Sequence, residues 1–153
     1  MTSDKLPDES HVVRYVKPSL VEDDAIDGSA FLLRQGEITL SVNWLEAFGG
    51  VDQDYQLDEV RRLSRLRLAR NGRFAKLSVG ETKRHVSEGA KEIGIPAELG
   101  VSAAPLDPAD DFEADPSHAV VTGLPPGDSD DALLIGDLIA ESVMYPLCPG
   151  RTI

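Results

Sequence analysis

The chain has 153 residues, of which 41% are hydrophobic and 27% are charged, as is ordinary for one soluble globular domain with a buried core. Its net charge is −12, so its mean field repels phosphate and argues against nucleic-acid binding by the whole molecule. No apolar run approaches the roughly 20 residues of a membrane span. The single cysteine, Cys148, excludes an internal disulfide and a cysteine-based metal cluster. Together with a polar N-terminus that lacks a signal-peptide pattern, this predicts a cytoplasmic protein.

Hydrophobic patterning predicts five or six strands. The segment HVVRYV at residues 11–16 is rich in β-formers, and Ile38, Leu40 and Val42 alternate with polar residues, as in a half-buried strand. Gln35-Gly36 could close a hairpin in front of that second strand. The predicted strands or extended segments span residues 11–16, 30–34, 37–43, 74–79, 98–106 and 117–123.

Three helices are predicted, over residues 58–70, 80–93 and 129–145. On the first, Arg67 and Arg70 fall among the apolar positions, so we expect them to face the core beside carboxylate partners. The second begins after the capping box Ser78-Val79-Gly80-Glu81. Pro146 ends the third, because proline cannot continue a helix.

These elements predict a single mixed domain. Strands and helices do not alternate strictly, which favours an α+β fold with a mostly antiparallel sheet of five or six strands and three helices over a doubly wound sheet. Residues 1–10 are expected to form a disordered tail and residues 11–146 the domain. Residues 147–153 are expected to form a C-terminal tail.

The charges are strongly segregated along the chain. Residues 61–91 hold ten of the fifteen basic residues and only two acidic ones, whereas residues 107–131 hold eight carboxylates and no Lys or Arg. A cationic strip on the first helix and beyond it could hold an anionic partner. The alternative is a solvent-exposed helix face whose positive charges are neutralised by acidic side chains of the same protein. The candidate partner-binding residues are Arg61, Arg62, Arg65, Arg73 and Lys76.

Catalytic signatures are absent from the sequence. It contains no P-loop, dinucleotide-binding glycine motif, H-E-x-x-H or G-x-S-x-G. The three histidines are far apart in sequence, and the acidic segment 107–116 lacks the central Gly and closing Glu of an EF-hand. We therefore expect no metal site and no cofactor.

Two residues nevertheless suggest an enzymatic alternative. His118 follows the acidic loop, where a carboxylate such as Asp115 could orient the ring for acid–base catalysis; a structural histidine is the other interpretation. Arg14 lies within the first strand, and if it faces inward its guanidinium needs a bound carboxylate or phosphate. If it faces outward, it is an ordinary surface arginine.

Arg14, followed by Gly28-Ser29-Ala30-Phe31, resembles the ADP-ribosyltransferase fold. The resemblance implies that a strand Arg and a strand Ser, here Arg14 and Ser29, hold a nicotinamide dinucleotide. Such folds also use a catalytic Glu or a second His, for which Glu113, Glu141 or His118 would have to serve. The enzymatic alternative is thus a nucleotide or phosphorylated ligand bound by Arg14, Ser29 and His118.

Three sets of segments together resemble a group of small, uncharacterised bacterial single-domain proteins. They are Gly28–Phe31 with residues 40–46, residues 60–63 with 72–75, and residues 115–119 with 123–125. The resemblance implies a compact bacterial protein and no particular chemistry. We expect a non-catalytic accessory or regulatory protein that acts by association with a protein partner, possibly encoded nearby. The alternatives are the enzyme described above and a weak nucleic-acid binder that uses residues 61–76.

Overall fold

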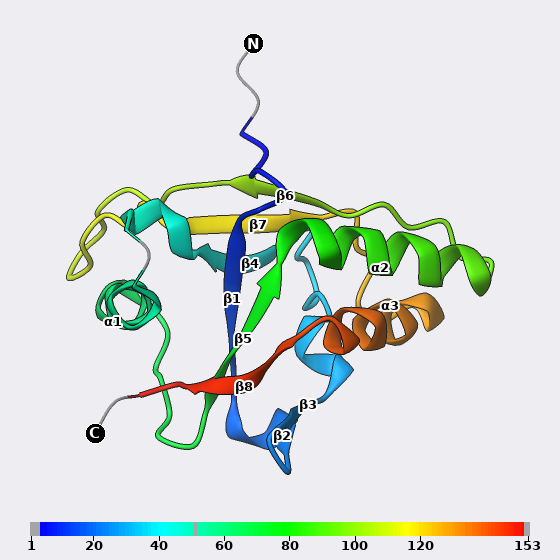
Figure 1. Cartoon of the computed structure of the whole chain (residues 1–153), viewed down its shortest axis with the longest axis horizontal. Coiled ribbons are helices and arrows are strands. Elements are labelled where there is room, and N and C mark those ends of the chain that lie inside the picture. Colours follow the sequence, from blue (N-terminus) through cyan, green and yellow to red (C-terminus); the bar gives the residue numbers. More distant parts are fainter. Residues whose placement is uncertain (1–3, 51, 152–153) are drawn as a thin grey trace.

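A six-stranded antiparallel sheet forms the centre of the computed structural model, which describes residues 4–50 and 52–151 (Figure 1). The strand order is β6-β7-β4-β1-β5-β8, and a separate two-stranded sheet pairs β2 with β3. The predicted α+β class is therefore confirmed. The strands are β1 His11–Val16, β2 Val21–Glu22, β3 Ala25–Ile26, β4 Leu40–Trp44, β5 Arg73–Ser78, β6 Gly100–Ala103, β7 His118–Thr122 and β8 Met144–Pro149. The helices are α1 Gln53–Leu63, α2 Val79–Glu92 and α3 Asp130–Glu141, with 3-10 turns η1 Pro18–Leu20, η2 Gly28–Phe31 and η3 Leu45–Phe48.

The sheet buries side chains on both faces. Alternation along β1 sends Val12 and Val16 to the larger core, which α2, α3 and η2 cover, and Val13 to a smaller core beneath α1 and η3. Figure 1 shows α1 on one side of the sheet and the α2–α3 pair on the other. The fold is thus three layers, with the sheet in the middle.

The first helix differs from its prediction in register. It spans Gln53–Leu63 rather than residues 58–70, because the Asp52 carboxylate caps it by accepting from the backbone N–H groups of Asp54 and Tyr55. The predicted placement of Arg67 and Arg70 toward the core is therefore wrong. Both lie beyond the helix and are exposed.

The C-terminal region also differs from its prediction. Helix α3 ends at Glu141 instead of Tyr145, and Met144–Pro149 forms β8, which pairs with β5. Residues 147–149 therefore belong to the sheet and not to a tail. Edge strands tolerate proline because one side of the strand needs no ladder hydrogen bonds, which accounts for Pro146 and Pro149 here.

The N-terminal segment is packed over the part that the structure describes. Leu6 is buried and its N–H donates to Val101 O at 2.9 Å, while Lys5 forms a bridge with Ser102. The predicted disordered tail therefore does not extend over residues 4–10. The segment covers the β6 edge of the sheet, which leaves β8 as the edge at the other end.

The predicted helix start at Ser78 is confirmed, since the Ser78 hydroxyl accepts a hydrogen bond from the Glu81 N–H.

The predicted hairpin over residues 30–43 is wrong: Gly28–Phe31 is a 3-10 turn and β4 begins only at Leu40. A small hairpin is formed instead by β2 and β3, over residues 21–26. Among the described residues, no helix is long and apolar enough to cross a membrane.

Candidate functional site

The predicted basic strip is held by contacts within the protein. Arg61 donates to Asp58 and to Pro149 O, both at 2.7 Å. Arg62 donates to Glu59 at 2.8 Å and also contacts Glu113 in the acidic segment. Because of their mutual hydrogen bonds, the pKa of the Arg62 guanidinium is raised and that of the Glu59 carboxyl is lowered.

The other members of the strip are partnered as well. Arg65 donates to the carbonyl oxygens of Asp107 and Glu113 at 2.6 and 3.1 Å. Arg73 lies 3.8 Å from the Asp24 carboxylate, and Lys76 donates to the Gln53 side chain. The strip is therefore largely engaged within the fold, and Arg73 alone of these three borders an open groove.

Arg14 faces the larger core, as the inward interpretation of β1 required. Its Nε donates to Ala30 O at 2.8 Å and its Nη1 to Ser41 O at 2.7 Å. Burial, followed by repulsion from Arg34, lowers the pKa of this guanidinium to about 10, while Glu37 acts to raise it. The group binds backbone carbonyls here, so its position is explained by the fold itself.

His118 does not share a cleft with Arg14. Ser29 lies in η2 and donates to Asp27, which also accepts its backbone N–H. His118 pairs with Asn43, which pairs with Val13, so its side chain lies on the α1 face of the sheet, opposite to that of Arg14. Strand alternation therefore places His118 and Arg14 on opposite faces of the sheet.

The remaining candidates for the enzymatic alternative lie elsewhere. Glu113 contacts Arg62, and Glu141 lies 2.8 Å from His85 Nε2 at the end of α3. Asp115, expected to orient His118, instead accepts from Asn43 and from the backbone and hydroxyl of Ser117. Among the described residues, no cluster of three or more His, Cys, Asp or Glu side chains could hold a metal ion.

An open groove of about 820 Å³ lies beside the edge strand β8. The segment after α1 forms one wall with Arg70, and the start of β5 contributes Arg73. The C-terminal segment forms the other wall with Tyr145, which is 54% exposed, and with Arg151. The complete lining is Asp24, Arg70, Asn71, Arg73, Tyr145, Pro146, Leu147, Pro149 and Arg151.

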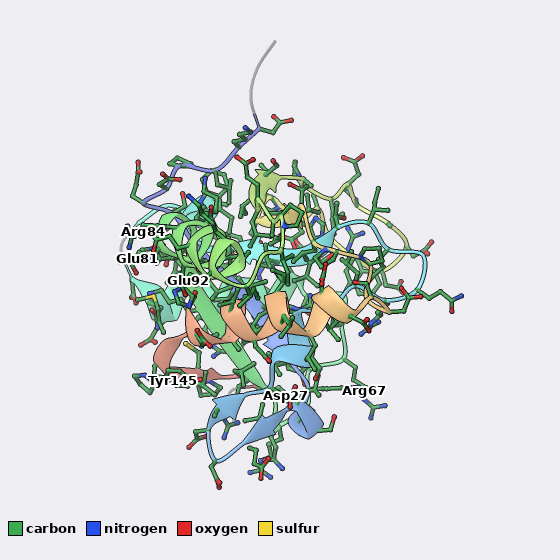
Figure 2. The ribbon with its side chains drawn as sticks, turned by 90° about the vertical axis from the view of Figure 1, so that its right-hand side faces the viewer. Asp27, Arg67, Glu81, Arg84, Glu92 and Tyr145 are labelled. Carbon is green, nitrogen blue, oxygen red and sulfur yellow. The ribbon has the colours of Figure 1, made fainter. Side chains whose placement is uncertain are left out.

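Three guanidiniums and one carboxylate make this groove cationic. Asp24 lies 3.8 Å from Arg73, while Arg70 and Arg151 are exposed and have no ion pair or side-chain hydrogen bond with any described residue. Two unpaired guanidiniums at one groove can bind carboxylate or phosphate groups in bidentate fashion. Arg67, on the same segment as Arg70, is exposed too (Figure 2).

Sequence reasoning found Arg73 and missed the other groove residues. Arg70 was placed toward the core because the predicted helix ends seven residues after the observed one, and Tyr145 was placed in a helix. The signal that could have helped was Asn71-Gly72, a turn that brings Arg70 and Arg73 to one end of the sheet. Arg151 gave no local signal, because it reaches the groove only through the pairing of β8 with β5.

Comparison with known proteins adds no relative: no family model, curated protein or solved structure matches this chain.

Proposed function

We propose that the protein is a non-catalytic accessory or regulatory protein whose groove at β8 binds an acidic segment of a partner protein. The observation that carries this proposal is the set of three guanidiniums, from Arg70, Arg73 and Arg151, around an open groove in a chain of net charge −12. An acidic segment is attracted to the groove and repelled by most of the remaining surface. Such a field directs a partner to one place on the protein.

The chemistry of the groove favours a protein over a nucleic acid. Tyrosine and arginine are enriched where proteins bind one another, and Tyr145 here adjoins the apolar Pro146 and Leu147. A nucleic acid would need more phosphate contacts than three arginines supply, and single-strand recognition uses several stacked aromatic rings. The cytoplasmic setting and a partner encoded nearby are parts of the same proposal.

The enzymatic alternative draws less support. It requires Arg14, Ser29 and His118 in one hydrogen-bond-scale site. His118 lies on the opposite face of the sheet from Arg14, and Arg14 already donates to two carbonyl oxygens.

Fluorescence anisotropy with a labelled peptide of alternating Asp and Gly residues tests the proposal. Wild-type protein should bind this peptide but not its Asn–Gly counterpart, and the affinity should fall as salt is added. The double variant Arg70→Ala/Arg151→Ala should bind about tenfold more weakly, which corresponds to about 1.4 kcal/mol.

The matched control is Arg84→Ala, which removes an exposed arginine of α2 without touching the groove (Figure 2). It should leave the affinity unchanged. Equal weakening by this control would show that net charge, rather than the groove, governs binding. Tighter binding of a duplex DNA oligonucleotide than of the acidic peptide would favour the nucleic-acid alternative instead.

A further inference from the structure

Ser41 and His118 form a hydrogen-bonded pair on the α1 face of the sheet, apart from the groove. The antiparallel pairing of β4 with β7 sets Ser41 opposite Val120, so His118 is its diagonal neighbour on that face. The Ser41 Oγ lies 3.2 Å from His118 Nε2. Serine is exposed at this position and His118 is half-buried, so the hydroxyl is open to a reactant.

A third group determines which nitrogen of the His118 ring carries the hydrogen. His118 Nδ1 lies 2.7 Å from the carbonyl oxygen of Ala104, which only accepts hydrogen bonds. Nδ1 therefore carries the hydrogen, and Nε2 of the neutral ring has a lone pair that accepts the Ser41 O–H. A nucleophile, a base and a group that orients the base are the three parts of an activated hydroxyl.

The backbone on both sides of the pair is held in place. Ser41 O accepts from Arg14 Nη1 at 2.7 Å, and Ala104 N–H donates to His118 O at 2.9 Å. The two side chains thus project from paired strands of the central sheet and not from mobile loops. Reactive side chains keep a fixed geometry best on such elements.

We propose that Ser41 is a nucleophile activated by His118, and that it accepts an acyl group from an activated ester or thioester. Oγ bonds to the acyl carbon while its proton passes to His118 Nε2. The carbon–oxygen or carbon–sulfur bond of the donor then breaks, and the leaving group departs with the electron pair and takes up the Ser41 proton from Nε2. The products are a Ser41 ester and a free alcohol or thiol. Donors with stable leaving groups suit this pair, since they need the least further stabilisation of the oxyanion.

The experiment uses p-nitrophenyl acetate as the acyl donor. Release of p-nitrophenolate is followed by absorbance, and intact-mass measurement with peptide mapping locates the acetyl group. Wild-type protein should gain one acetyl group at Ser41. Ser41→Ala should abolish it, and His118→Gln should slow it about a hundredfold, as loss of a general base does.

Ser102→Ala is the control, because it removes a half-buried hydroxyl from the neighbouring strand β6 and should leave the rate unchanged. Ser41→Ala removes only an exposed hydroxyl, so its folding is not at risk. The proposal is overturned if Ser41 of the wild type stays unmodified while lysines react, or if a folded His118→Gln variant acetylates Ser41 at the wild-type rate.

Discussion

The guanidinium carbon of Arg65 lies 5.5 Å from the centroid of the Phe112 ring. The same guanidinium donates to the carbonyl oxygens of Asp107 and Glu113, so one side chain ties the end of α1 to the acidic segment 107–116. The basic and acidic stretches that are separate in sequence are therefore neighbours in the fold (Figure 1). Arg62, which contacts Glu113, strengthens the same junction.

Replacing Arg65 should loosen the acidic segment. Arg65→Ala removes two charge-assisted hydrogen bonds and a cation–π contact, so we expect the free energy of unfolding to fall by about 1–3 kcal/mol. Arg65→Lys should recover only part of this loss, because an ammonium group cannot bind two carbonyls and stack on a ring in the same geometry. Urea unfolding followed by circular dichroism measures both. A lysine variant as stable as wild type would show that charge alone matters here.

Two helical glycines offer a matched test of packing. A Cβ at Gly136 of α3 would lie 2.4 Å from the backbone oxygen of Gly28, whereas one at Gly89 of α2 would meet the flexible end of Leu138 at 2.5 Å. Alanine improves helix propensity at either position by about 1 kcal/mol. Because backbone cannot yield, Gly136→Ala should lower the free energy of unfolding by about 1–3 kcal/mol. Gly89→Ala should lower the free energy of unfolding by less than Gly136→Ala does. Thermal or urea unfolding that finds Gly136→Ala the more stable variant would contradict this account.

The predictable part of the fold is the part that local chemistry determines. Ser78 and Glu81 identified the start of α2, and the alternation of Leu40 and Val42 identified β4. The end of α1 was placed too late because the helical spacing of apolar residues continues past Leu63. Its start was missed because the capping residue Asp52 is polar and lies outside that hydrophobic pattern. β8 was missed because its two prolines argue against a strand anywhere except at a sheet edge, and edges are decided by tertiary structure.

The candidate sites were less predictable for a related reason. The groove combines Asp24, Arg70 and Arg151, which only strand pairing brings together. His118 was identified as a possible base, but its partner Ser41 is 77 residues away and was read as one polar position of a half-buried strand. Spacing along a sequence carries no information about such cross-strand neighbours.

The hydroxyl of Thr82 offers a gain in stability. Thr82 is 7% exposed, its Oγ1 has no hydrogen-bond partner among the described residues, and it borders a small apolar cavity of about 20 Å³ beside Phe31 and Leu77. Thr82→Val keeps the shape and removes the unpaired group, so the free energy of unfolding should rise by about 1 kcal/mol. Thr122→Val, at a half-buried position of β7, is the control and should change it less. A Thr82→Val protein that is less stable than wild type would mean that the hydroxyl has a partner, such as a buried water.

Arg14 predicts a dependence of stability on alkaline pH. Its guanidinium is charged in both native and unfolded chains below the native pKa of about 10. Between that value and the higher, ordinary pKa of arginine, the native state has lost the proton and the unfolded state still holds it. The unfolded state then binds more protons, so the contribution of Arg14 to the free energy of unfolding rises with pH in this window.

The comparison of wild type with Arg14→Gln isolates this contribution from the lysines and tyrosines that titrate in both proteins. From about pH 9 to about pH 11, the free energy of unfolding of the wild type should increase relative to that of the variant by about 1 kcal/mol. At any pH the variant should also be the less stable protein, because glutamine cannot reach both Ala30 O and Ser41 O as the guanidinium does. Urea unfolding across this pH range measures both effects. A difference between the two proteins that stays constant with pH would show that Arg14 keeps its proton throughout, and that its two carbonyl partners outweigh the cost of burying the charge.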